Sequence, residues 1–129
     1  VFAAGNLLRG AEGADASALE GQHAARTIHA FLQAGEWPEH ALPIHVEPPI
    51  VWVSPNVVSA PNDRLASDSL LFRVSEFRPA VQVQILQGEV VLHRQWFQSV
   101  QPNRSLHLST NWLRAVNPDG VALRLVLAR

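Results

Sequence analysis

The 129-residue sequence contains no cysteine, which excludes a disulfide framework, a thiolate metal site and a redox-active cysteine pair within it. It also has no G-x-G-x-x-G fingerprint, so it does not encode the start of a dinucleotide-binding βαβ unit. Charged residues make up only 16% and the net charge is −1, which provides no electrostatic basis for binding nucleic acid or an anionic membrane. No apolar run approaches the roughly 20 residues of a membrane span, and the N-terminus lacks the plan of a signal peptide. We therefore expect neither nucleic acid nor membrane as a partner.

Catalytic and metal-binding motifs are missing as well. There is no Ser-His-Asp order, nucleophile elbow or paired-carboxylate motif, so hydrolase chemistry has no support. His23 and His29 are six residues apart, which places them on different faces of a helix. His93 and His107 are expected at outward positions of neighbouring strands, where they would form a cross-strand pair. The sequence thus predicts no catalytic residue and no metal site.

The apolar fraction of 47% is sufficient for a folded core, and residues 1–35 have the period of a helix. Residues 1–4 resemble the end of a buried strand, followed by a turn at Gly5-Asn6. A helix is predicted from Asp15 as N-cap to Gly35 at its C-terminal end. Its apolar face consists of residues spaced three and four apart: Gly21, Ala24, Ala25, Ile28, Phe31 and Leu32.

The remainder of the chain has the period of strands. Prolines 38, 43, 48 and 49 indicate a linker and a domain boundary at residues 36–49. Alternating apolar residues between turn signals then predict an antiparallel β-sandwich, or a barrel, of six to seven strands. The predicted strands cover residues 50–53, 70–74, 81–85, 89–97, 105–109 and 121–127, and residues 111–116 form either a helical turn or an irregular strand. Tryptophans and phenylalanines are expected to fill the core, with Trp96 in line with Leu92; a stacking platform for a sugar or base is the alternative.

Two sets of residues resemble a known family. Gly5-Asn6, Gly10, Glu20-Gly21 and Ala24-Ala25 resemble the last FAD-contacting segment of flavoproteins with two dinucleotide-binding domains. The nearest likeness is to pyridine nucleotide-disulphide oxidoreductases and the small subunit of glutamate synthase. Further along, Gly-Glu-Val-Val-Leu-His-Arg at 88–94, Pro-x-Arg-x-Leu-x-Leu at 102–108 and Trp-Leu at 112–113 are similar to the β domain appended to some bacterial members.

The resemblance implies a site and a domain plan. Residues 1–35 would be a strand-turn-helix remnant at the C-terminal edge of an α/β FAD-binding domain, residues 36–49 the linker, and residues 50–129 the β-sandwich domain. The implied cofactor-binding residues are Gly5, Asn6, Asp15, Ala16 and Ser17. The glycine allows close backbone approach, and the helix N-terminus directs its free amides at the flavin pyrimidine ring. The family has an aspartate that accepts a hydrogen bond from the ribityl chain where this chain has Asn6, which accepts without the assistance of a charge.

We therefore interpret the chain as the C-terminal fragment of a cytoplasmic, FAD-dependent oxidoreductase that transfers electrons between NAD(P)H and a second substrate. Its partner is the missing N-terminal part that binds FAD and NAD(P). The fragment alone is expected to be inactive and not to retain FAD. An exposed helix face would also support a homodimer. The alternative is a non-enzymatic β-sandwich module for interaction or ligand binding, in which the apolar helix face packs entirely on the chain's own sheet.

Overall fold

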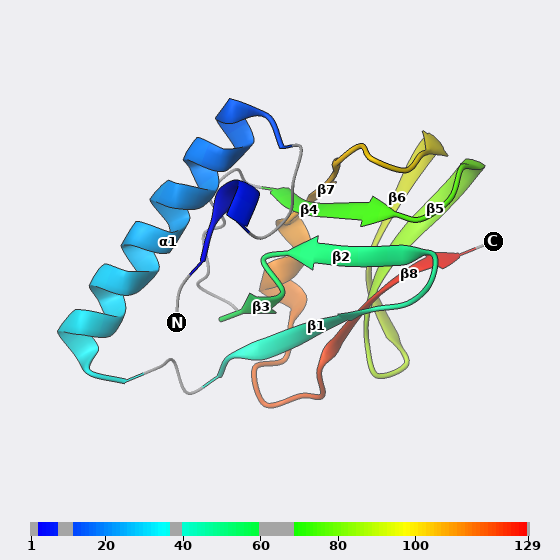
Figure 1. Ribbon diagram of the computed structural model, residues 1–129. Helices are drawn as coiled ribbons and strands as arrows, with labels where there is room; N and C mark the ends of the chain where they lie inside the picture. Colours follow the sequence, from blue (N-terminus) through cyan, green and yellow to red (C-terminus); the bar gives the residue numbers. More distant parts are fainter. Residues whose placement is uncertain (1–2, 8–11, 37–39, 60–68, 129) are drawn as a thin grey trace.

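The computed structural model describes residues 3–7, 12–36, 40–59 and 69–128, and within these ranges the protein is mainly β. Eight strands and a single α-helix are present among the described residues, together with two short 3-10 helices (Figure 1). The 3-10 helices are η1 (Gly5–Leu7) and η2 (Asn111–Ala115). The expectation of a predominantly β protein with one N-terminal helix is therefore confirmed.

The strands form two sheets. The larger has the order β3-β1-β8-β5-β6, and the smaller has the order β2-β4-β7. The strands of the larger sheet are β1 (Leu42–Val46), β3 (Val57–Val58), β5 (Arg78–Gln87), β6 (Val90–Val100) and β8 (Leu123–Ala128). Those of the smaller sheet are β2 (Ile50–Ser54), β4 (Ser69–Val74) and β7 (Leu106–Ser109). Buried residues of both sheets, among them Phe72 and Ile85, belong to one hydrophobic cluster, so the arrangement is sandwich-like.

Strand β1 corrects two predictions. It lies within residues 36–49, which were predicted to be a linker, and it pairs parallel with β8, so the larger sheet is mixed rather than antiparallel. The buried-exposed alternation of Leu42, Pro43 and Ile44 is that of a strand with one buried face. Pro43 is tolerated because the ladder to β8 begins one residue later, at Ile44. The two-residue strand β3 was likewise predicted to be loop, which raises the strand number above six or seven.

Helix α1 (Ala14–Ala34) forms where the sequence predicts a helix, with a different beginning. Its N-cap is Gly13 in an extended conformation, whereas Asp15, the predicted cap, lies in the first turn. Its end is as predicted, because Gly35 adopts a left-handed conformation (φ 75°) and donates its N–H to the Phe31 carbonyl at 2.8 Å. The predicted strand is wrong at Ala3 and Ala4, which are irregular and lead into η1; residues 1 and 2 lie outside the described residues.

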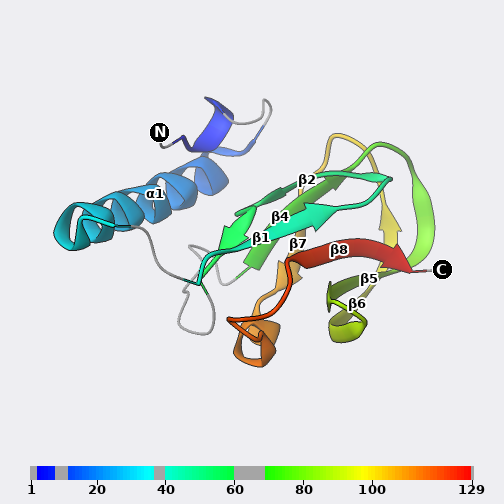
Figure 2. The same cartoon turned by 90° about the horizontal axis from the view of Figure 1, so that it is seen from below.

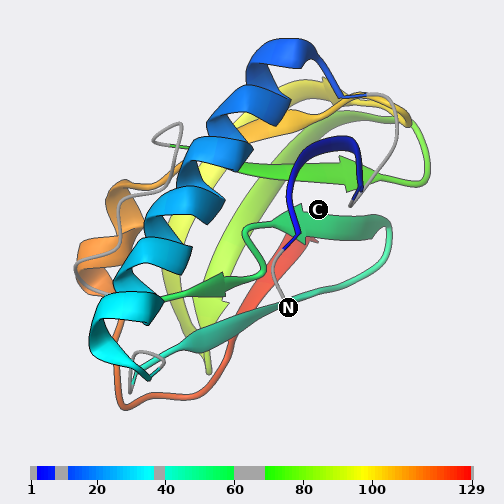
Figure 3. The same cartoon turned by 60° about the vertical axis from the view of Figure 1, so that its left-hand side comes forward.

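Helix α1 lies beside the two sheets rather than within their core. Figures 1 and 2 show it set apart from the strands, and Figure 3 shows it running across the side of the sandwich. No residue of α1 is buried, and Leu32 of its apolar face is 72% exposed. Toward the strands the helix directs an adjoining face, which includes Leu19 and His23 and shares Ala24 with the apolar face. At about 100° per residue, the two faces are centred roughly a third of a turn apart around the helix axis.

Of the aromatic residues predicted to fill the core, Phe72 is buried and Trp96 is exposed. Phe72 is fully buried and makes an edge-to-face contact with Phe97, with ring centroids 5.7 Å apart. Trp96, by contrast, is 67% exposed, which contradicts its assignment to the core. Ladder pairing shifts between Ile85 and Leu86, so that Ile85 opposes His93 and Leu86 opposes Val91. This irregularity breaks the alternation from Leu92 onward and turns Trp96 outward. Trp37 lies outside the described residues.

Candidate functional site

The predicted glycine turn sits against the first turns of α1. Gly5 is buried with φ of 64°, a conformation that residues with a side chain rarely adopt. A Cβ at this position would lie 3.4 Å from the Cβ of Ser17. The Gly5 N–H donates to Oε2 of Glu20 at 3.0 Å. The turn is thus fixed both by the absence of a side chain and by a carboxylate one turn further along the helix.

Because the N-cap of α1 is Gly13 and not Asp15, the free N–H groups at its N-terminus lie two residues earlier in the chain than predicted. With Gly13 as N-cap, the N–H groups without an intrahelical acceptor are those of the first helical residues, Ala14 to Ala16. The Ser17 N–H donates to the Gly13 carbonyl at 3.0 Å and is therefore part of the helix. Its side chain is different: the Ser17 Oγ is buried and has no hydrogen-bond partner among the described residues.

The two remaining predicted residues, Asn6 and Asp15, are exposed. Asn6 is exposed, and its Oδ1 accepts the Glu12 N–H at 2.9 Å, so one of its acceptor positions closes the loop before α1. Asp15 is exposed in the first turn, where its negative charge is favourable next to the helix N-terminus. The structure therefore brings Gly5 and Ser17 into contact, places Ala16 next to them on the helix, and leaves Asn6 and Asp15 at the surface.

A buried ion pair that the sequence did not predict ties this segment to the smaller sheet. The Arg73 guanidinium of β4 lies 2.5 Å from Oε1 of Glu12, and their side chains are 11% and 4% exposed. Ser105 bridges the pair: its Oγ donates to Glu12 and accepts from Nε of Arg73 at 3.1 Å. The guanidinium also stacks over Trp52, 5.4 Å from the ring centroid. No sequence signal joins residues so far apart, because only the fold brings them together.

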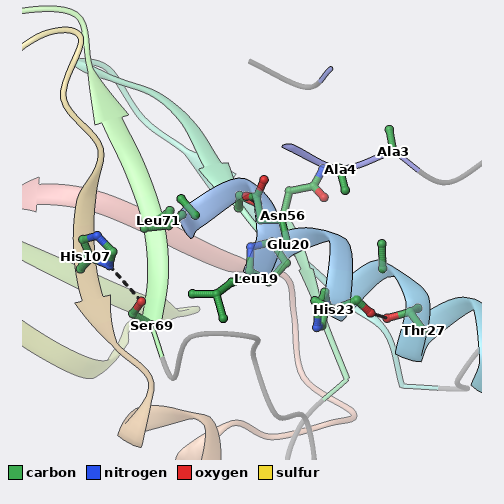
Figure 4. A pocket seen from close by; sticks show the side chains of 14 residues that line it. Ala3, Ala4, Leu19, Glu20, His23, Thr27, Asn56, Ser69, Leu71 and His107 are labelled. Carbon is green, nitrogen blue, oxygen red and sulfur yellow. Dashed lines mark hydrogen bonds between the residues drawn. The ribbon is translucent and has the colours of Figure 1, made fainter. Parts of the chain in front are cut away.

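A cavity of about 210 Å³ separates α1 from the smaller sheet (Figure 4). Figure 4 shows Leu19 and His23 of α1 on one side, and Leu71, Ser69 and His107 of β4 and β7 on the other. The full lining comprises Ala3, Ala4, Ala16, Leu19, Glu20, His23, Ala24, Thr27, Ser54, Pro55, Asn56, Ser69, Leu71 and His107. No local sequence pattern indicates this cavity, because its walls come from five separate stretches of chain.

Glu20 closes one end of the cavity. Its Oε1 accepts the hydroxyl of Ser54 at 3.0 Å, while its Oε2 accepts the Gly5 N–H. This carboxylate therefore links the glycine turn, the helix and strand β2, which agrees with a structural role rather than that of a general base. The neighbouring Ala16 lines the cavity and also belongs to the predicted flavin-contacting turn.

The histidines do not form the predicted cross-strand pair, because β6 and β7 belong to different sheets. His107 Nδ1 is 3.1 Å from the Ser69 Oγ, and His93 Nε2 is 3.3 Å from the Ser109 Oγ. The side chain of Gln95 joins the two sheets at this edge by bonding the His107 carbonyl and the Ser109 N–H. Within the described ranges, no cluster of three or more His, Cys, Asp or Glu residues is arranged to hold a metal ion.

No protein-family model, curated protein or solved structure matches the chain. Of the helices in the described part of the chain, none has the length and apolar character needed to cross a bilayer.

Proposed function

We propose that this chain is the closing part of an FAD-binding domain followed by a β-sandwich domain, in an oxidoreductase that transfers electrons between NAD(P)H and a second substrate. The observation that supports it most is the left-handed Gly5 seated against Ser17 at the beginning of α1. A left-handed glycine turn that meets a helix N-terminus leaves the backbone open to close approach by a cofactor.

Three features fit a flavin here. The N–H groups of Ala14 to Ala16 and the positive end of the helix dipole favour a carbonyl-rich or anionic ring edge. The buried Ser17 Oγ has no partner among the described residues and would gain one from a bound ligand. Asn6 keeps a second acceptor position on its carbonyl oxygen for a ribityl hydroxyl. Bound FAD would supply the electron transfer, while the chain positions the flavin and favours negative charge on it.

The alternative, a self-contained β-sandwich module, requires the apolar helix face to pack on the chain's own strands. None of the α1 residues is buried, and Leu32 is largely exposed, which favours a further polypeptide over that face. The missing nucleotide-binding part is the proposed cover, and in the isolated chain a second copy would take its place. The substitution Leu32→Gln should then reduce self-association of the isolated chain, as measured by light scattering.

The proposal is tested by flavin content. The isolated chain should purify without a visible flavin absorbance band, because it has no nucleotide fingerprint. The polypeptide encoded by the complete gene should contain two such fingerprints and stoichiometric FAD. Stoichiometric FAD on this chain alone, or a complete gene without either fingerprint, would contradict the proposal.

A matched pair of glycine substitutions in the complete polypeptide tests the site itself. Gly5→Ala forces a side chain into a left-handed turn and against Ser17, and it should weaken FAD binding about tenfold, the equivalent of about 1.4 kcal/mol. Gly88→Ala is the control, because it introduces the same left-handed strain (φ 60°) in the turn between β5 and β6, away from α1. Equal FAD affinity in the two variants would remove Gly5 from the binding site.

A further inference from the structure

The cavity between α1 and the smaller sheet is large enough for a small organic molecule. Cavities of roughly 150 Å³ accommodate benzene, so about 210 Å³ corresponds to about eight non-hydrogen atoms. Drug-sized ligands occupy roughly 300–1,000 Å³, and the three-ring system of a flavin belongs to that class. The occupant of this cavity is therefore not the flavin, and the cavity can bind a ligand whether or not the chain is part of a flavoprotein.

The walls of the cavity are mainly apolar. Leu19 of α1 and Leu71 of β4 lie near each other in Figure 4, and Ala24 and Pro55 also line the space. Leu71 is buried beneath the cavity, and Leu19 and Ala24 are half-buried. Such a surface favours an apolar ring or chain and penalises a charged ligand, which would lose its hydration.

The polar groups at the rim are hydrogen-bonding partners: imidazoles, hydroxyls and the carboxylate of Glu20. His107 uses Nδ1 toward Ser69, which leaves Nε2 for a ligand. The His23 imidazole, on the opposite side, has no hydrogen bond to any described residue, and the Thr27 hydroxyl next to it can accept a bond (Figure 4). The two oxygens of Glu20 accept bonds from Gly5 and Ser54. Its negative charge makes an anion the least favourable occupant.

We propose that this cavity is a binding site for a small neutral molecule that combines an apolar ring of benzene size with one hydroxyl or amide group. The ring occupies the space between Leu19 and Leu71, and the polar group bonds an imidazole nitrogen of His23 or His107. The site uses both α1 and the smaller sheet, so it exists only when the helix is in place.

Three probes of equal size and different charge test this proposal on the isolated chain at pH 8: benzyl alcohol, benzylamine and benzoate. Binding is followed by amide chemical shifts in nuclear magnetic resonance spectra. Benzyl alcohol should bind with Kd in the millimolar range, roughly −4 kcal/mol for eight atoms, and shift the amides of Leu19, His23 and Leu71. Benzylamine and benzoate should bind at least tenfold more weakly. Tighter binding of either charged probe, or shifts confined to other parts of the chain, would overturn the proposal.

Two substitutions locate the site. Ala24→Leu should fill the cavity and weaken benzyl alcohol binding at least tenfold, whereas Ala18→Leu, on the opposite and exposed side of the same helix, should leave it unchanged. Toluene has the same ring without the hydroxyl and should bind the unsubstituted chain more weakly than benzyl alcohol; His23→Leu or His107→Leu, whichever removes the bonding imidazole, should abolish this difference. Unchanged binding in both Ala24→Leu and His23→Leu would place the probe elsewhere and refute the assignment.

Discussion

At the scale of single residues, the pair of Glu12 and Arg73 holds the N-terminal segment on the β domain. Both side chains are nearly excluded from water, and Ser105 bonds to each of them. Removing one partner of a buried pair costs roughly 3–5 kcal/mol, because the other charge stays in a poorly solvated place. The segment before α1 can move into water and relieve part of this penalty, so the lower part of that range applies here.

We therefore expect Arg73→Met to lower the free energy of unfolding by roughly 3 kcal/mol, as measured by urea denaturation. The matched control is Arg78→Met, which removes an ion pair with Glu76 in which both side chains are well exposed. Exposed pairs contribute about 0–1 kcal/mol, so this control should change little. If both variants lost the same free energy of unfolding, the buried pair of Arg73 and Glu12 would contribute no more than the exposed pair of Arg78 and Glu76.

Gln87 has a buried amide that holds the turn before β8. Its Nε2 donates to the carbonyls of Asn117 and Val121 at 2.8 and 3.0 Å, and its Oε1 accepts the Asn117 N–H at 2.9 Å. A Cβ at Gly120 would lie 2.6 Å from Nε2 of Gln87. Gly120→Ala must therefore displace the amide from its three bonds.

The expected cost of Gly120→Ala is about 1–3 kcal/mol in the free energy of unfolding, the penalty of leaving buried polar groups without good partners. Gly21→Ala is the control, because a Cβ there meets no atom within 4 Å. It should stabilise the chain by about 0.5–1 kcal/mol, because alanine replaces glycine within a helix. Thermal unfolding followed by circular dichroism measures both changes. A Gly120→Ala variant as stable as the wild type would mean that Gln87 moves without loss.

At the scale of elements, two tryptophans that composition treats alike have different roles. Trp112 of η2 is 2% exposed, and its indole N–H donates to the Ser109 carbonyl at 2.7 Å. Trp96 of β6 lies on the outer face of the larger sheet, opposite Gln82. Trp112→Ala should therefore cost about 3–5 kcal/mol in the free energy of unfolding, and Trp96→Ala less than about 1 kcal/mol. Urea denaturation of the two variants measures the difference; a larger loss for Trp96→Ala would contradict the observed orientation of β6.

The same strand shows why elements are easier to predict than the faces they bury. Alternation in β5 predicts Val81, Val83 and Ile85 as inward residues, and all three are buried. The prediction for β6 is wrong at Trp96 because the register irregularity near Leu92 depends on pairing with β5, which one strand's sequence does not encode. Helix α1 is similar: its bounds follow closely from local signals, but the face that meets the strands is set by polar contacts such as Glu20 to Ser54.

At the scale of the whole molecule, the site is less predictable than the fold. The turn at Gly5 and the helix that follows it are local features, and the sequence predicts both; the approach of Gly5 to Ser17 is found only in the structure. The cavity and the Glu12 pair arise only when β4 and β7 pack beside α1, and parallel pairing of β1 with β8 likewise joins distant segments. These contacts depend on long-range topology, for which a single sequence has no periodic signal.

The whole-molecule arrangement predicts two levels of stability. Residues Val83, Ile85, Leu123 and Leu125 in β5 and β8 are fully buried, whereas α1 has no buried residue and meets the smaller sheet partly through Glu20 and Ser54. Elements with few buried contacts open locally without global unfolding. Amide hydrogen exchange in α1 should therefore be on the order of 100-fold faster than in β5, equivalent to a difference of about 3 kcal/mol in opening free energy.

Removing the contact between α1 and the smaller sheet should increase the difference in opening free energy between α1 and β5. Ser54→Ala deletes the hydroxyl that donates to Glu20, so it should accelerate exchange in α1 several-fold while exchange in β5 stays the same. The control is Ser75→Ala, because the Ser75 hydroxyl is exposed and bonds only to the Pro49 carbonyl among the described contacts. If α1 and β5 exchange at one common rate in the wild type and respond together to Ser54→Ala, the helix is part of the cooperative core. In that case α1 does not open separately from the strands, and its exposed position does not require a covering partner for stability.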